Sequence, residues 1–134
     1  MDSEKTFIEE RLMINLMLLK IYPCLKGYLY IKEGAKRIIE DSSFKYNLHK
    51  RLYKDLSSSF KESEELIDRG MRHAINTGIK KQGIPDFERH TKFHFTDSRP
   101  TPRELLIILA ESVKFEWNKI KNNKQEYIEA CSKL

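Results

Sequence analysis

The chain has 134 residues, with 25 Lys and Arg against 20 Asp and Glu and a formal net charge of +5. This length suits one domain with its own core, and the mild positive charge permits a polyanionic partner without requiring one. The two cysteines, Cys24 and Cys131, have no partners at metal-ligand spacing, which favours free thiols in a reducing cytoplasm over a disulfide framework.

Residues 1–22 predict an N-terminal helix, from about Glu4 to Ile21, that Pro23 ends. The segment begins acidic, and Asn15 interrupts its short apolar run, which excludes a membrane span or a secretory leader and favours a soluble, intracellular protein. Its apolar stripe is wide, so we expect burial on more than one side, with pairing to another chain as the second interpretation. The stripe consists of Ile8, Leu12, Leu16 and Leu19, widened by Met13, Met17 and Leu18.

Residues 27–40 start with strand-forming side chains, but their apolar positions repeat at helical spacing and predict a second helix. Residues 41–43 form a turn and a new cap. A third helix should run from about Phe44 to Phe60, with a bend near residues 50–53. The positions expected to face the core are Tyr28, Ile31, Ala35 and Ile38 in the second helix, and Leu48, Leu52, Leu56 and Phe60 in the third.

A polar turn then leads to a fourth helix at residues 63–80, in which Ser63 is the N-cap and Glu64 and Glu65 occupy the first turn. Two helices joined by a short turn, the second exposing Arg, His and Asn, meet the needs of a helix-turn-helix that reads a major groove. Many helical scaffolds share this pattern, so by itself it favours a scaffold. Ile67, Met71, Ala74 and Gly78 form the expected buried face, and Asp68, Arg69, Arg72, His73 and Asn76 form the exposed one.

Residues 86–95 predict a short helix or turn. Its His90 and His94 stand at i and i+4, a spacing that can bind a metal, but no acid or cysteine completes a known ligand arrangement. We therefore interpret both as surface imidazoles and expect no metal site.

Thr101 and Glu104 predict the start of the last helix, with Thr101 as N-cap and Glu104 closing a capping box. This helix is the most apolar in the chain, should form the central pillar of the core and is expected to continue through Ile120. Residues 119–134 are polar and rich in lysine, and we interpret them as a fraying or weakly docked tail. The candidate anchors of this tail are Tyr127 and Ile128.

The sequence lacks the site motifs of enzymes: it has no Gly-rich phosphate loop, nucleophile elbow, HExxH sequence or Cys pair. It therefore predicts a protein that is not an enzyme and needs no cofactor. No internal repeat or linker divides the chain. We expect a single all-α domain over residues 1–134, built as a compact bundle of about six helices.

Four segments resemble, in the same order, parts of the C-terminal effector domain of the stage-zero sporulation response regulator, the master transcription factor of endospore-forming bacteria. Residues 26–33, KGYLYIKE, resemble its KGYLYLREA signature, and residues 41–60, which contain LYKDL, resemble its first DNA-proximal helix. Residues 69–75, RGMRHAI, resemble the centre of its recognition helix, and residues 99–104, RPTPRE, resemble the start of its last helix. The similarity covers about residues 26–113, and on this basis the chain is identified as a member of that family.

The resemblance implies a six-helix bundle with a helix-turn-helix, of the winged-helix-like type found in response-regulator effectors. It also implies binding to double-stranded DNA in the major groove, often as two domains on adjacent boxes. Arg69 and Arg72 would read bases, because an arginine can donate two hydrogen bonds to guanine, and His73 would lie at or near the DNA backbone. Lys54 and Lys61 would contact phosphates. The DNA-binding residues implied by the resemblance are Lys54, Lys61, Asp68, Arg69, Arg72, His73 and Asn76.

The start of the fourth helix departs from the family pattern. Leu66 stands where the family has a base-contacting arginine, and Glu62, Glu64 and Glu65 stand where it has small hydroxyl residues. Acids near phosphates oppose the electrostatic attraction that supplies much of the affinity for DNA. The chain is also too short for a receiver domain, so we expect DNA binding that does not depend on receiver phosphorylation.

We expect a stand-alone, sequence-specific transcription regulator that reads DNA through residues 63–80, located in the cytoplasm and associated with the nucleoid. The alternative is a non-catalytic interaction protein that keeps the fold, has lost most DNA affinity and modulates a full-length regulator or another partner. A homodimer or heterodimer would form through the first helix or on adjacent DNA boxes. No membrane partner is expected.

Overall fold

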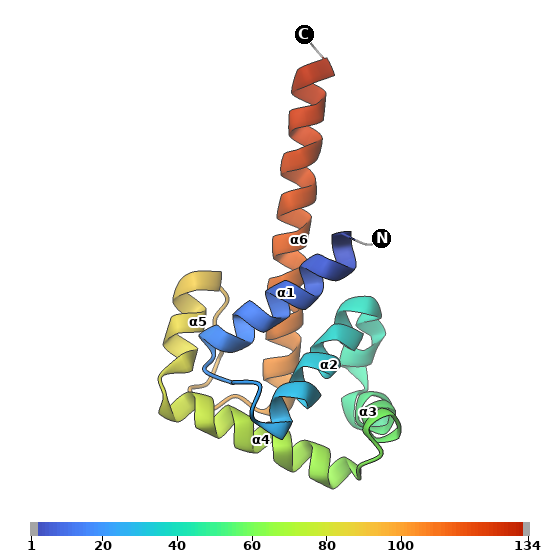
Figure 1. Cartoon of the computed structure of the whole chain (residues 1–134), viewed down its shortest axis with the longest axis vertical. Coiled ribbons are helices and arrows are strands. Elements are labelled where there is room, and N and C mark those ends of the chain that lie inside the picture. The colour runs from blue at the N-terminus through green and yellow to red at the C-terminus, as the bar shows by residue number, and fades with distance from the viewer. Residues whose placement is uncertain (1–2, 133–134) are drawn as a thin grey trace.

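The computed structural model describes residues 3–132, and within this range every regular element is helical. The elements are α1 (Ser3–Leu18), α2 (Lys26–Glu40), η1 (Ser42–Tyr46, a 3-10 helix), η2 (Leu48–Leu52, a π-helix), α3 (Tyr53–Phe60), α4 (Glu64–Lys80), α5 (Gly83–Thr91) and α6 (Pro102–Ser132). Figure 1 shows a bundle through which α6 passes, with α4 across one end and the C-terminal part of α6 projecting from the other. The predicted all-α bundle is confirmed, although residues 3–132 contain no β-strand and so no β-wing.

The second helix, α2, packs against both α4 and α6, and its existence as one helix is confirmed. At its start, Gly27 crosses α4 at Gly70. A Cβ atom on Gly27 would overlap the Gly70 carbonyl oxygen and lie 2.7 Å from the Cβ of Ala74, so only glycine permits this close approach. The predicted inner face of α2 is buried as expected; its residues are Tyr28, Ile31, Ala35 and Ile38.

Replacing Gly27 by alanine should lower the free energy of unfolding by about 1–3 kcal/mol, because the added Cβ forces α2 and α4 apart. Gly34→Ala is the matched control on the same helix, since its Cβ would lie 3.0 Å from a movable Leu106 methyl group rather than from backbone. Alanine improves helix propensity at both positions, so the difference between the variants reports the clash. Equal denaturant midpoints for the two variants would contradict the close crossing.

The predicted end of α1 at Ile21, caused by Pro23, is wrong. The helix ends earlier because Lys20 adopts a left-handed conformation with φ 60°. The N–H of Lys20 donates to the Met17 carbonyl at 3.0 Å, and the N–H of Ile21 donates to the Leu16 carbonyl at 3.0 Å, which is the pattern of a Schellman motif. This turn folds the chain back, and Ile21 enters the core with 1% exposure.

One face of α1 is buried and the other is open, so the expected burial on more than one side is wrong. Met13 and Met17 are 44% and 56% exposed, and Leu18 is half-buried. The inner face of α1 also carries a buried polar side chain, Asn15. Its Nδ2 donates to the Ser112 hydroxyl at 3.1 Å, which satisfies the buried amide. Ile8, Leu12, Leu16 and Leu19 are buried as predicted.

The single helix predicted at residues 44–60 is also wrong, because the stretch is divided into η1, η2 and α3. Asn47 lies between η1 and η2 with φ −149° and ψ 57°, outside the helical region. The inward side chains are as predicted, with Leu48, Leu52 and Leu56 buried. Phe60 is half-buried and meets Tyr30 edge to face, with ring centroids 5.0 Å apart.

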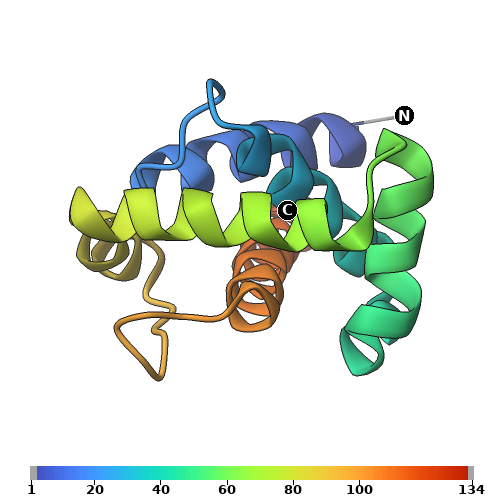
Figure 2. The same cartoon turned by 90° about the horizontal axis from the view of Figure 1, so that it is seen from below.

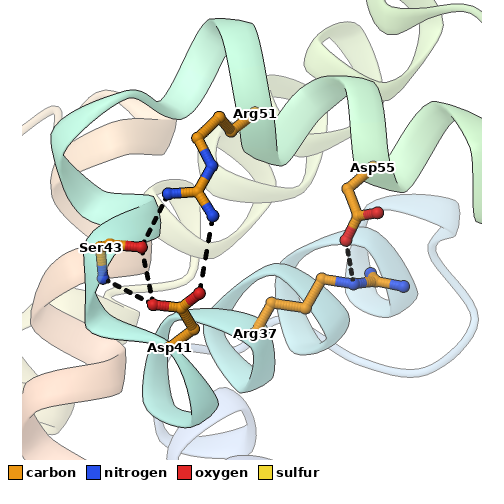
Figure 3. Close-up of polar contacts among 5 residues, drawn as sticks. All are labelled: Arg37, Asp41, Ser43, Arg51 and Asp55. Carbon is orange, nitrogen blue, oxygen red and sulfur yellow. Dashed lines mark hydrogen bonds and ion pairs between the residues drawn. The ribbon is translucent and has the colours of Figure 1, made fainter.

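A polar cluster connects this irregular stretch to its neighbours (Figure 3). Asp41 caps the turn as predicted, since its carboxylate accepts from the backbone N–H of Ser43 at 3.0 Å and from the Ser43 hydroxyl at 2.7 Å. Arg51 of η2 donates to the Ser43 hydroxyl at 2.7 Å and lies 3.5 Å from Asp41. Arg37 of α2 contacts Asp55 of α3 at 2.9 Å. An exposed pair such as Arg51–Asp41 adds little stability, so we interpret the cluster as orienting the stretch.

The fifth helix, α5, begins before the predicted segment 86–95 and ends before His94. The Nδ1 atom of His90 lies 2.9 Å from the carbonyl oxygen of Asp86, and that of His94 lies 3.7 Å from a Glu88 carboxylate oxygen. The two exposed rings therefore have separate partners. Within the described range 3–132, no group of three or more His, Cys, Asp or Glu side chains could hold a metal ion.

The start of α6 is capped as predicted, because the Thr101 hydroxyl accepts from the N–H of Glu104 at 3.2 Å. The second half of the capping box is not formed, since the Glu104 carboxylate accepts instead from the N–H of Thr96 at 3.1 Å. This helix is the central pillar that we expected. Its buried residues include Leu105, Leu106, Leu109, Ala110 and Val113.

The predicted fraying of residues 119–134 is wrong for the described residues, because α6 continues without a break to Ser132, whereas their exposed side chains agree with the alternative of weak docking. The C-terminal part of α6 projects from the bundle (Figure 1), and the described side chains from residue 118 onward are exposed. No Pro or Gly follows Pro102 in the sequence, so no residue there interrupts the helix. Ile128 is 51% exposed and therefore does not anchor this segment, and the side chain of Tyr127 lies outside the described residues.

Candidate nucleic-acid interface

The α3–α4 pair is joined by a tight turn of the kind found in helix-turn-helix units. Lys61 ends α3 in a left-handed conformation with φ 55°, and its N–H donates to the Ser57 carbonyl. The N–H of Glu62 donates to the same carbonyl at 3.2 Å, and the Ser57 hydroxyl donates to the Glu62 carbonyl at 2.5 Å. Ser63 then caps α4 as predicted, by accepting from the N–H of Leu66 at 3.2 Å. These bonds fix the direction in which α4 leaves α3.

The helix that follows, α4, lies across the end of the bundle opposite the projecting part of α6 (Figures 1 and 2). Its inner face is buried as predicted, in Ile67, Met71, Ala74, Ile75 and Gly78. Its outer face carries the predicted reader residues together. Arg69, Arg72, His73 and Asn76 are exposed, and the side chain of Asp68 is 28% exposed.

A bridge of hydrogen bonds joins the two helices on this face. The Tyr53 hydroxyl of α3 donates to one carboxylate oxygen of Asp68 at 2.7 Å, and Nε of Arg72 donates to the other at 2.7 Å. Burial raises the pKa of Tyr53, and the bond to Asp68 raises it further, so the hydroxyl stays protonated as a donor. The bond to Asp68 likewise raises the pKa of Arg72. Tyr53 was not among the predicted site residues, although it lies in the LYKDL segment that resembles the family's first DNA-proximal helix.

The first turn of α4 places acidic and apolar groups beside the reader residues. Glu64 and Glu65 are exposed, Glu62 is half-buried, and Leu66 is 45% exposed. The helix dipole favours acids at this end, so Glu64 and Glu65 stabilise the helix. The same carboxylates would repel phosphates that approach this end.

Basic residues flank the pair on the side of α3. Lys61 is exposed at the turn, and Lys54 is exposed on α3. Lys54 lines a shallow hollow of about 430 Å³ together with Lys50 and Arg51. Lys50 was not predicted as a site residue, and its place beside Lys54 follows from the π-helical turn that precedes α3.

A loop residue that we did not predict, Arg99, also belongs to this surface. A hollow of about 150 Å³ is lined by Arg72 and Asn76 of α4 and by Arg99 and Thr101 of the segment before α6. Arg99 is exposed, so it extends the basic surface of α4 onto this loop. Arg99 belongs to the RPTPRE segment, which carries part of the family resemblance and predicts the start of the last helix.

The bundle, the tight turn and the exposed basic helix are typical of helix-turn-helix domains that bind DNA. The chain belongs to the family of the sporulation initiation factor Spo0A C-terminal domain, whose family model matches residues 13–113. The match confirms the resemblance and extends it into the second half of α1. This family consists of DNA-binding transcription factor domains rather than enzymes, so the general class of the chain is a DNA-binding regulator. In the described residues, no helix is both long and apolar enough to cross a lipid bilayer.

Proposed function

We propose that this chain is a sequence-specific transcription regulator that inserts α4 into the major groove of double-stranded DNA. The observation that carries the proposal is the outer face of α4, where Arg69, Arg72, His73 and Asn76 are exposed together at one end of the bundle. Arg is the side chain best suited to two hydrogen bonds with guanine, and Asn can pair in the same way with adenine. Side chains of these kinds on one accessible helix can supply a sequence code.

The remaining predicted residues take supporting roles in this proposal. His73 lies at the edge of the face and would contact the DNA backbone. Lys54 and Lys61, on α3 and at the turn, would bind phosphates and orient the domain without reading sequence. Asp68 stands among the readers, and its carboxylate could accept from a cytosine amino group.

We further propose that DNA binding by this chain does not require phosphorylation of a receiver domain. Support comes from the open face of α4, which no other segment within residues 3–132 covers. A face that is already accessible needs no release step before it meets DNA. Cellular abundance, a ligand or a partner would then control the protein, which we place in the cytoplasm with the nucleoid.

A second candidate function is a DNA-independent interaction protein that modulates a full-length regulator or another partner. The acids Glu64 and Glu65 beside Leu66 favour it, because they weaken attraction to phosphates. The half-exposed Met13 and Met17 of α1 favour it as well, since they leave an apolar face for a homodimer or heterodimer. A stoichiometric complex formed in the absence of DNA would support this function, and a steep fall of DNA affinity with salt would count against it.

The proposed function is tested by selection from a pool of randomised duplexes, followed by polarisation titration of the enriched sequences with unphosphorylated protein. We expect enrichment of one short sequence and tighter binding to it than to random duplexes. A pool that shows no enrichment would contradict a sequence-specific regulator.

The Lys61→Ala variant should bind selected and random duplexes more weakly to the same extent, because a phosphate contact carries no sequence information. The slope of log K against log salt should become shallower by about 0.9 for one lost phosphate contact. Lys124→Ala is the matched control, since Lys124 is exposed on the projecting part of α6, remote from α4. Loss of affinity for the selected duplex alone would show that Lys61 reads sequence.

A further inference from the structure

We propose that Tyr53 and Asp68 are positioning residues that hold the Arg72 guanidinium in the conformation that reads a base, an inference that rests on the DNA-reading function proposed above. The three side chains form one bridge from α3 to α4, with Asp68 in the middle. In this arrangement Asp68 acts through Arg72, in place of the cytosine contact considered above.

Tyr53 and Arg72 bind different carboxylate oxygens of Asp68. The Tyr53 hydroxyl donates to Oδ1 of Asp68 and Nε of Arg72 donates to Oδ2, each at 2.7 Å. Bonds of this length between an ionised acceptor and a good donor are among the strong hydrogen bonds of proteins. Because Tyr53 is only 5% exposed, its ring is fixed in the core and cannot follow a moving carboxylate.

The bond through Nε leaves the reading end of Arg72 available. A guanidinium carries five N–H donors, and Nε supplies one of them. The four N–H groups of the two terminal nitrogens remain for the O6 and N7 atoms of a guanine. Since the Arg72 side chain is 56% exposed, its terminal nitrogens can reach a ligand while the bridge persists.

Tyr53 distinguishes this bridge from an ordinary pair on a helix surface. An exposed i,i+4 pair alone contributes little, because both side chains remain mobile. Here the buried Tyr53 of α3 holds the Asp68 carboxylate in place, and the carboxylate in turn holds Arg72. By contrast, Arg69 has no hydrogen-bond or ion-pair partner among residues 3–132, and it must become ordered when it binds. The entropy lost when a side chain becomes ordered lowers the affinity. The bridge reduces this loss for Arg72, which is already held in place, and not for Arg69.

The Tyr53→Phe variant should bind the selected duplex about three- to tenfold more weakly, because the long side chain of Arg72 must then become ordered on binding. Binding to random duplexes should not change. Because the phenyl ring fills the same space, we expect the fold to be kept, and Tyr46→Phe is the matched control at a 78% exposed position. Asp68→Asn is the second variant, which keeps the shape but removes the charge that holds Nε.

A double-mutant cycle separates positioning from a structural role. Tyr53→Phe should have no further effect in an Arg72→Ala background and should keep its full effect in an Arg69→Ala background. Equal effects in the two backgrounds would overturn the proposal, because a general disturbance of α3 would act on both. If the wild-type protein selects no sequence at all, the proposed function and this inference fail together.

The bridge can also be measured without DNA. In the free protein, NMR should show slower hydrogen exchange with water at Nε of Arg72 than at Nε of Arg69, and Tyr53→Phe should accelerate the exchange at Arg72. Similar exchange at the two arginines in the wild type would overturn the bridge itself, whatever the DNA titrations show.

Discussion

The double variant Arg69→Ala/Arg72→Ala should lose sequence preference and bind the selected duplex no better than a random one. Each good Arg–guanine pair is worth about 1–3 kcal/mol of discrimination, so two independent pairs would cost about 2–6 kcal/mol together. Fluorescence polarisation with a selected and a scrambled duplex at fixed salt measures this difference. The variant should fold normally, because both side chains are exposed.

Charge is the main alternative cause of such a loss, since the double variant also removes two positive charges. Lys119→Ala/Lys124→Ala removes the same charge from exposed positions in the C-terminal half of α6, the half that extends away from α4 (Figure 1). This control should keep its preference for the selected duplex. If both double variants lose affinity alike, or if neither does, the assignment of Arg69 and Arg72 as readers is wrong.

The Leu106→Ala variant should lower the free energy of unfolding by about 2–5 kcal/mol, the range for large-to-small changes in a packed core. Leu106 is 0% exposed in α6 and lies against Gly34 of α2, where its methyl group would be 3.0 Å from an added Cβ. Neighbouring atoms at this distance leave little room to refill the space. Denaturant titration followed by circular dichroism gives the change.

The matched control for Leu106 is Ile120→Ala on the same helix. Ile120 is 42% exposed and lies in the C-terminal half of α6. Its loss should change the free energy of unfolding by less than about 0.5 kcal/mol, as is usual for surface positions. A large effect at Ile120 would mean that this part of α6 packs against something in solution, such as a second copy of the chain.

The first turn of α4 determines how well the proposed reader can work. Glu64 and Glu65 are exposed beside the basic face, and Leu66 presents a 45% exposed apolar side chain there. Arg99 and Lys50, which we did not predict, add positive charge on both flanks of the pair. The exposed basic side chains therefore lie at the middle of α4 and on the adjoining loop, and not at the N-terminal turn of α4.

Local chemistry in the sequence determined where most of the helices form and which of their side chains face the core. The caps at Ser63 and Thr101 were predictable because a side-chain oxygen must satisfy the free N–H groups at a helix start. The inner and outer faces of α4 were predictable because the helical period places residues three and four apart on one side. The order of four segments was sufficient to identify the family, which the match over residues 13–113 confirms.

Tertiary packing decided the features that depend on residues far apart in the sequence. The turn at Lys20 ends α1 and allows Ile21 to pack in the core. No local signal in residues 1–22 specifies this turn. Tyr53 meets Asp68, 15 positions further along the chain, because the turn at Lys61 brings α3 beside α4. Spacing along a helix fixes which residues share a face, but only the packing of one element on another fixes which faces meet.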